Sequence, residues 1–346
     1  MKNYLLHLDK EFLRLIKVIS DKAYQQNISV YLVGGIVRDI LLGEKVFDID
    51  VVVEADAIDF AKYLSKCFNA RCVTYNAFGT ASLFLSSVRI DFVTARSEIY
   101  KYPGALPTVK KGALIEDLFR RDFTINAMAL SLNKNSWGAL IDPYNGLEDL
   151  KKKKICVLHD KSFIDDPTRI LRAVRFEQRL GFSIEKKTLI LLKAALENKC
   201  FFAVNIHRSF LEFKKMLEEN PFKCLKRLNS LFGMEFLVGT KKICLGQIRS
   251  LEHKKWIVCL MALLKEMRIK EREMLFKKFS LTKKEKKALA ESLKVKDILT
   301  QLSKKDLTRL QVCVILKPFE REALQYFLCL AKNIEARKKI EQFLRK

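Results

Sequence analysis

The sequence LVGGIVRDILLGEKVFDIDVVV, residues 32–53, contains two structural signals in one short unit. An apolar strand enters the dipeptide Gly34-Gly35, a short helical segment follows, and a β-branched strand then carries Asp48 and Asp50. Side chains alternate between the two faces of a strand, so these two carboxylates point to the same side. Strand, glycine turn, helix and acidic strand together predict a mixed α/β head.

The acidic strand predicts a metal site. Two carboxylates on one face repel each other unless a cation lies between them, and hard oxygen ligands favour Mg²⁺, with Mn²⁺ as a substitute. Two such ions form the usual arrangement for displacing pyrophosphate with a 3′ hydroxyl. The alternative is a solvated strand edge with two exposed aspartates, which is the commoner explanation of an isolated Asp-x-Asp pattern.

The surrounding residues favour the metal site over the strand edge. Gly34 and Gly35 lie between a strand and a helix, where backbone N–H groups approach a phosphate without obstruction by a Cβ atom. Arg38 is placed to bind phosphate oxygens bidentately, while Asp39 is either a capping or a positioning group. These residues predict a phosphate site beside the two carboxylates.

Asp91 lies inside the otherwise apolar strand VRIDFVTAR. A buried carboxylate is costly unless it has a partner. Asp91 is therefore either a third acid of the metal site or the partner of Arg89 or Arg96. We expect it at the metal site and count it among the catalytic residues.

The remaining chain divides into a mixed α/β part, to about residue 150, and a helical part from residue 167 onward. Residues 96–112 contain two tyrosines, two prolines and two glycines, which is typical of a loop. Residues 117–130 are expected to begin as a helix and to pass into a strand. With only 12 glycines and 6 prolines, the chain as a whole is expected to be helix-rich.

The net charge of +25 favours a polyanionic partner, either nucleic acid or an anionic surface. Residues 241–346 hold 28 of the 65 Lys and Arg but only 12 of the 40 Asp and Glu, so the surplus is concentrated there. The alternative is a lysine-rich surface without a specific partner. The nine cysteines show no CxxC pair, and the N-terminus shows no signal peptide or membrane span. A reducing, cytoplasmic location is expected.

Four motifs, in the same order and spacing, resemble those of the class II tRNA nucleotidyltransferase and bacterial poly(A) polymerase family. The first is GGIVRD with DID, the second is RRDFTINAMA at 120–129, the third is DPYNG at 142–146, and the fourth is DDPTRILRAVRF at 165–176. The resemblance runs from about residue 28 to 217. Beyond residue 217 the chain shares only the family's helical and basic character. It implies a head with a polymerase β-like palm, followed by an all-α neck, body and tail. The expected divisions are 1–150, 151–218, 219–280 and 281–346, with RNA binding in the last two.

The resemblance also implies roles for individual residues. Gly34, Gly35 and Arg38 hold the triphosphate, and Asp48 and Asp50 bind the metals. In the second motif, Arg121, Asp122 and Asn126 surround the sugar and phosphates. Asp122 lies near the ribose 2′ hydroxyl, where a carboxylate acceptor disfavours deoxynucleotides. Without the motif, Arg121 and Asp122 indicate only a helix-surface ion pair.

The fourth motif is similar to the family's base-reading element, although its first acid is Asp165 where the family usually has Glu. Asp166 and Arg169 match the pair that binds the Watson–Crick edge of cytosine or adenine, so that side chains replace a template. Arg172 and Arg175 are candidate phosphate ligands. For Arg175 a salt bridge within the neck is an equal alternative.

The implied activity is template-independent addition of C and A to the 3′ end of tRNA, from CTP and ATP, with Mg²⁺ as cofactor. The tRNA is expected to bind through its acceptor and T arms, by shape rather than sequence. The segment ARSEIYKYPGALPTV, residues 95–109, resembles the family's flexible loop and argues against addition of CC alone. An A-adding enzyme and a poly(A) polymerase stay open, as does a non-catalytic RNA-binding protein with the same fold. The sequence does not indicate the oligomeric state.

Overall fold

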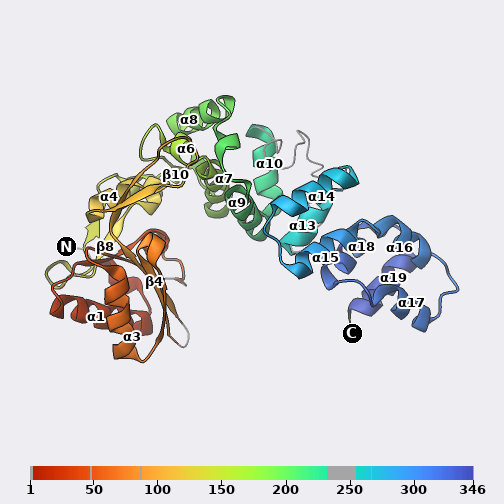
Figure 1. The fold of residues 1–346 in the computed structure, drawn as a ribbon, viewed down its shortest axis with the longest axis horizontal. Coiled ribbons are helices and arrows are strands. Elements are labelled where there is room, and N and C mark those ends of the chain that lie inside the picture. The colour runs from red at the N-terminus through yellow and green to blue at the C-terminus, as the bar shows by residue number, and fades with distance from the viewer. Residues whose placement is uncertain (1–2, 47–48, 86–87, 232–254, 266, 346) are drawn as a thin grey trace. The chain divides into compact units, whose positions relative to one another are not determined.

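The structure is a computed structural model, and it describes residues 3–46, 49–85, 88–231, 255–265 and 267–345 (Figure 1). The chain divides into two compact units. Unit 1 consists of Met1–Arg169 and Gly181–Ala195, and unit 2 consists of Ile170–Leu180 and Leu196–Lys346. The division passes through two helices, α7 (Thr168–Leu180) and α8 (Lys186–Glu197).

Unit 1 contains a seven-stranded mixed sheet in the order β3-β4-β5-β2-β1-β8-β9. The strands are β1 (Val30–Val33), β2 (Ile49–Val53), β3 (Arg71–Tyr75), β4 (Thr80–Phe84), β5 (Arg89–Thr94), β8 (Ala129–Ser131) and β9 (Leu140–Ile141). Strands β2 and β5 are parallel, and the other neighbours are antiparallel. The α+β head with a mixed sheet, predicted from the sequence, is confirmed.

Among its described residues, unit 1 contains six α-helices besides parts of α7 and α8. They are α1 (Lys10–Gln25), α2 (Gly35–Leu42), α3 (Ala57–Phe68), α4 (Leu114–Phe119), α5 (Gly146–Lys151) and α6 (Ser162–Asp165). Two of the six, α1 and α3, begin at an aspartate N-cap. Asp56 caps α3 by accepting from the backbone N–H of Ile58 at 3.0 Å and of Asp59 at 3.1 Å. Phe60 of α3 meets Phe92 of β5 edge-on, with ring centroids 5.8 Å apart. Helix α3 therefore covers one face of the sheet.

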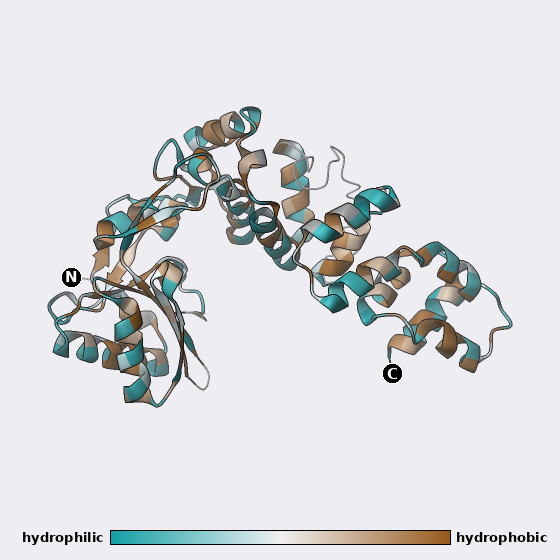
Figure 2. Ribbon diagram, viewed as in Figure 1, coloured by the Kyte–Doolittle hydropathy of each residue, from teal (hydrophilic) through white to brown (hydrophobic). Residues whose placement is uncertain are grey.

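Unit 2 is helical among its described residues. Besides part of α7 it contains α9 (Ile206–Glu219), α10 (Pro221–Leu231), α13 (Trp256–Leu263), α14 (Ile269–Lys278), α15 (Lys283–Ser292), α16 (Val295–Leu302), α17 (Arg309–Leu316), α18 (Arg321–Leu330) and α19 (Ile334–Leu344). Phe210 of α9 stacks on Phe279 with ring centroids 4.0 Å apart and meets Trp256 of α13 at 5.9 Å. In Figure 2 brown and teal alternate around many of these helices, as expected for helices that bury one side. No helix among the described residues of the chain is both long and apolar enough to cross a membrane.

Two expectations about local structure were wrong. The expected loop at 96–112 contains a two-stranded antiparallel sheet of β6 (Arg96–Ile99) and β7 (Thr108–Lys111), in which Ser97 pairs with Lys110 and Glu98 with Val109. The helix expected from 117 begins at Leu114 and ends at Phe119, before the RRDFTIN motif. A short parallel pair, β10 (Lys154–Ile155) with β11 (Ser183–Ile184), was not predicted.

Candidate active site

The turn between β1 and α2 depends on Gly34. Its φ of +78° lies in the region that L side chains rarely adopt. A Cβ atom there would lie 2.6 Å from Nη1 of Arg121, which is too close. The guanidinium of Arg121 therefore lies directly against the backbone of the glycine turn, and the two predicted motifs meet there.

The acidic residues lie beside this turn. Strand β1 runs antiparallel to β2 with Leu32 opposite Val51, so the end of β1 and the start of β2 are adjacent. Asp50 of β2 is in register with Asp91 of the parallel strand β5. Directly opposed residues share a face, so both carboxylates lie on the same side of the sheet. Asp48 lies outside the described residues.

Asp91 has protein partners in this structure. Its Oδ1 accepts from Ser82 Oγ at 2.5 Å, and its carboxylate forms a two-point ion pair with the guanidinium of Arg89, with Nε 2.9 Å from Oδ1. The sequence left Arg89 open as such a partner, and the geometry supports that alternative. A direct catalytic role for Asp91 stays a prediction.

The donor chemistry of this face fits part of a magnesium site. Asp50 and Asp91 present carboxylate oxygens, the ligands that Mg²⁺ prefers. Among the described residues no group of three His, Cys, Asp or Glu is arranged to hold a metal ion. Asp50 is thus the described member of the predicted pair, and its partner Asp48 stays a prediction.

A buried hydrogen-bond chain joins the first motif to the second. Arg38 is only 3% exposed, and its Nη1 donates to Asn126 Oδ1 at 2.6 Å while its Nε donates to Asp39 Oδ1 at 2.9 Å. Asn126 in turn donates from Nδ2 to Asp122 Oδ1 at 3.0 Å. The same oxygen accepts from the backbone N–H of Phe123 at 2.8 Å. Arg38, Asn126 and Asp122, predicted separately, therefore form one assembly.

Asp117, which the sequence interpretation missed, holds the arginines of the second motif. It is fully buried, and its carboxylate pairs with Nη2 of Arg121 at 2.8 Å and with Nη2 of Arg120 at 2.6 Å. Burial on its own raises the pKa of a carboxyl group, but Arg121 and Arg120 outweigh it and hold the pKa of Asp117 below its ordinary value. The four-residue spacing from Asp117 to Arg121 was the signal for this pair.

The predicted base-reading pair is held rigidly within unit 1. Arg169 is 4% exposed and donates from Nη1 to Ser162 Oγ at 2.6 Å and from Nη2 to the carbonyl oxygen of Arg120 at 2.7 Å. Asp166 Oδ1 accepts from Thr168 Oγ1 at 2.6 Å and from the Thr168 backbone N–H at 3.1 Å, which caps α7. Arg169 thus reaches the backbone of the RRD motif.

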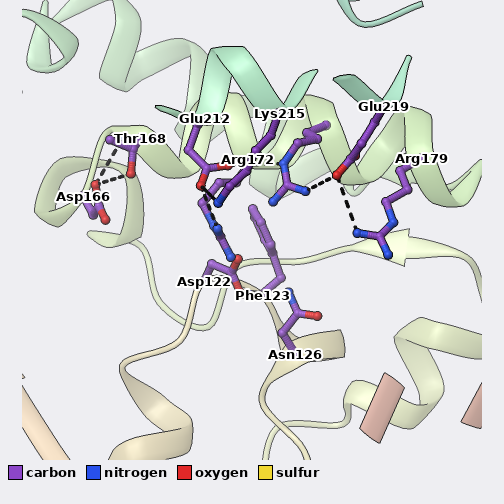
Figure 3. Close-up of polar contacts among 11 residues, drawn as sticks. Asp122, Phe123, Asn126, Asp166, Thr168, Arg172, Arg179, Glu212, Lys215 and Glu219 are labelled. Carbon is purple, nitrogen blue, oxygen red and sulfur yellow. Dashed lines mark hydrogen bonds and ion pairs between the residues drawn. The ribbon is translucent and has the colours of Figure 1, made fainter. Parts of the chain in front are cut away.

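Arg172 and Arg175 of α7 lie among the acids of α9, within unit 2 (Figure 3). Arg175 is 5% exposed and pairs with Glu212 at 3.2 Å and Glu219 at 2.7 Å, whereas Arg172 pairs with Glu212 at 3.1 Å. Burial opposes ionisation of Glu212, yet the arginines and Lys215 hold its pKa below the ordinary value. These contacts support the salt-bridge alternative for Arg175.

A groove of about 650 Å³ lies in unit 1 beside Arg169. Its wall includes His159, whose ring lies 5.2 Å from that of Phe119, and Tyr100, whose hydroxyl donates to Glu98 Oε2 at 2.8 Å. Burial and the nearby Glu98 raise the pKa of Tyr100, so it is a neutral donor. Glu98 also accepts from Arg120, at 3.1 Å, and thereby links the β6–β7 segment to the second motif.

The sheet, the glycine turn and the joined motifs define a nucleotidyltransferase head, and comparison with known proteins agrees. Residues 30–156 match the family model described as the poly(A) polymerase head domain. A solved CCA-adding enzyme is 33% identical, with a TM-score of 0.82 over 100% of this chain and 87% of that one. The Thermotoga maritima CCA-adding enzyme complexed with tRNA is 31% identical, with a TM-score of 0.76 and coverage of 100% and 86%. The chain belongs to the tRNA nucleotidyltransferase and poly(A) polymerase family.

Curated relatives include A-adding tRNA nucleotidyltransferases. The protein of Aquifex aeolicus is 48% identical over 195 residues, which are 56% of this chain and 24% of that protein. The protein of Halalkalibacterium halodurans is 38% identical over 237 residues, which are 67% of this chain and 55% of that protein. The chain thus spans between about a quarter and just over half of the length of these two relatives.

Replacing Gly34 with Ala is expected to destabilise the protein more than replacing Gly43, the control. Both glycines have φ above +70°, but a Cβ at Gly43 meets nothing within 4 Å. Gly43→Ala should cost about 1 kcal/mol through backbone strain alone. Gly34→Ala should cost about 1 kcal/mol or more beyond that, because its ψ of −132° lies outside the αL region that Gly43 adopts and because Arg121 must move from its place. Urea unfolding measures both; equal losses would mean that Arg121 is not held against this turn.

Replacing Asp117 with Asn is expected to lower the free energy of unfolding by about 3 kcal/mol at pH 7, because two partly buried guanidinium groups lose their shared charge partner, which is itself fully buried. The pKa of Asp117 is depressed in the folded state, so its stabilisation is full at neutral pH. It disappears as the pH falls below about 4. Urea titrations across pH should show the two proteins converging in acid.

The control for this variant is Asp160→Asn, which removes an exposed pair with Lys187. It should change stability by less than about 1 kcal/mol at every pH. A difference between the Asp117 variant and wild type that persists unchanged into acid would contradict the role of the carboxylate charge.

Proposed function

We propose that this chain transfers nucleotides from a nucleoside triphosphate to the 3′ end of tRNA. The observation that carries the proposal is the hydrogen bond between Arg38 and Asn126, 2.6 Å long, which joins the two nucleotide-binding motifs next to Asp50 and the glycine turn. Residues from distant parts of the sequence are thereby brought together. Solved relatives with 31% and 32% identity are described as complexes with ATP and with CTP, which supports these substrates.

Different residues of unit 1 bind different parts of the nucleoside triphosphate. Arg121 and the glycine turn bind phosphates, because the guanidinium lies against Gly34 at the N-terminus of α2. Asp122, fixed by Asn126, accepts from a ribose hydroxyl. Asp50, with Asp48 as predicted partner, would hold Mg²⁺, which supplies Lewis-acid chemistry to the attacking 3′ hydroxyl and the departing pyrophosphate.

Asp166 and Arg169 select the base in this proposal. Arg169 is held by Ser162 and by the Arg120 carbonyl oxygen, so the direction of its side chain is set before a nucleotide enters. A guanidinium and a carboxylate in fixed places discriminate bases by their donor and acceptor pattern. The basic helices of unit 2 bind the tRNA backbone, as their surplus of Lys and Arg favours. The cytoplasmic location stays a prediction.

Two candidate activities differ in which nucleotides they add to the 3′ end of tRNA. The three curated relatives with 38% to 48% identity are A-adding enzymes, whereas the CCA-adding enzyme of a Geobacillus strain is 35% identical over a similar length. This order favours addition of the terminal A, which we propose as the activity. Complete CCA addition, the prediction from the sequence, is the second candidate. It is supported by the CCA-adding solved structures that match 100% of this chain.

The proposed activity is tested with purified protein, labelled ATP and CTP, and tRNA transcripts that end before the first C, after the second C, or after the A. Only the transcript ending in CC should gain a nucleotide, from ATP and with added Mg²⁺. Incorporation of CTP into the shortest transcript would establish complete CCA addition instead. An unstructured RNA that is extended as well as tRNA would indicate a poly(A) polymerase, and binding without any incorporation would indicate a non-catalytic protein.

Replacing Arg169 with Ala is expected to reduce the preference for ATP over the other three nucleotides by about tenfold or more, because one base-reading side chain is removed. Arg179→Ala is the control, since Arg179 lies on the same helix and pairs with Glu219 at 3.6 Å. Competition between the four nucleoside triphosphates measures the preference. Slower incorporation with unchanged selectivity would assign Arg169 to the structure alone.

A further inference from the structure

The sheet of unit 1 has one covered face and one face that stays partly open. Helix α3 packs on the side that carries Ile90, Phe92 and Leu83, all of which are buried. The opposite side carries Asp50 and Asp91, which are only half-buried. Alternation along the strands assigns every residue of this open face.

Three side chains form a row across the open face, near the same end of the sheet as the carboxylates. Arg71 of β3 is in register with Phe84 of β4, and Phe84 is in register with Arg89 of β5. All three are exposed, Phe84 to 38% and the Arg89 side chain to 55%. The guanidinium of Arg71 lies 5.5 Å from the centroid of the Phe84 ring. The row thus presents one aromatic face between two positive charges.

The row is adjacent to the carboxylates that the proposed reaction uses. Asp91 is two residues from Arg89 on β5 and pairs with it, and Asp50 is the register partner of Asp91 on β2. Phe84 is the diagonal cross-strand neighbour of Asp91, and residues in such positions lie about 7–8 Å apart, with their Cβ atoms somewhat closer. A nucleic-acid strand whose 3′ end lies at Asp50 therefore has the row within reach of its next nucleotide.

We infer that Arg71, Phe84 and Arg89 form a platform for the acceptor RNA strand, on which Phe84 stacks with the base next to the 3′ end and the two arginines contact the flanking phosphates. An aromatic ring between guanidinium groups is suited to single-stranded RNA, because every base has a π face and every linkage a phosphate. The inference rests on the proposed function, since the 3′ hydroxyl is what locates the strand. The platform contacts RNA without reading its sequence.

A purely structural explanation of the same row is available. Strand β3 is the last strand of its sheet, and a charged residue on such a strand prevents pairing with another chain. Arg71 over Phe84 would then only shield the edge. The two explanations differ in what they predict for RNA binding, so the experiment compares RNA affinity with stability.

The test uses the full chain and a minihelix of tRNA acceptor and T arms that ends in CC, with the fluorescent base 2-aminopurine next to the 3′ end. Wild-type protein should quench its fluorescence through stacking on Phe84. Phe84→Leu, which keeps the volume apolar, should abolish the quenching and raise KM for the minihelix about tenfold, with KM for ATP unchanged. Phe84→Tyr should retain both properties.

The charge of the platform is tested separately. Arg71→Gln should weaken minihelix binding and reduce the slope of log Kd against log salt by about one, as expected for one lost phosphate contact. Lys66→Gln on the exposed side of α3 is its control and should leave the slope unchanged. Tyr75→Leu is the control for Phe84, because Tyr75 is 49% exposed and lies on the same face at the other end of β3.

The outcomes separate this inference from the proposed function. An active wild-type protein whose Phe84→Leu and Arg71→Gln variants keep the wild-type KM, quenching and salt slope would overturn the platform alone. A drop in melting temperature without these changes would favour edge shielding and would also overturn it. Quenching by a wild-type protein that incorporates no nucleotide would contradict the proposed function and leave RNA binding at the row supported.

Discussion

The buried guanidinium of Arg38 imposes the constraint on which the head site depends. A charge that is 3% exposed requires partners, because removing it from water without them costs several kcal/mol. Asn126 and Asp39 supply those partners at 2.6 and 2.9 Å. Helix α2 and the segment around Asn126 are therefore fixed to each other, and Asp122, which accepts from the same Asn126, is positioned with them.

A second guanidinium, that of Arg121, is likewise held by an acidic partner, in this case against the glycine turn. Arg121 lies where a Cβ atom of Gly34 would lie, and Asp117 holds it there from a fully buried position. The charge of Arg121 and the N-terminus of α2 thus meet at one turn. The arrangement attracts phosphate, and it also explains why the fold tolerates a buried aspartate: Asp117 is ionised because two arginines outweigh its desolvation.

Much of this head was predictable from sequence because the strand and helix signals are local. Alternation placed Asp50 and Asp91 on their strands, and register then showed that they are neighbours. The RRDFTIN segment was not predictable as irregular structure, because its shape depends on side-chain bonds to distant residues such as Arg38. The pairing of residues 96–99 with 108–111 was also missed. It depends on contacts between two segments separated by a glycine-containing turn, so neither segment predicts it alone. The family roles of single residues came from the resemblance, not from geometry.

The open face of the sheet follows from a conflict between stability and chemistry. Covering both faces with helices would bury more apolar surface, but it would also bury Asp50, Asp91 and Arg89 and leave no room for a strand of RNA. The chain instead packs α3 on one face and covers the other with α4 only around Val52, so that charged and aromatic side chains stay exposed where Arg89 balances Asp91. The part of this face that carries the ion pair can receive a polyanion, because phosphate groups satisfy the same arginines. Its polar character is therefore a condition for binding RNA beside the carboxylates.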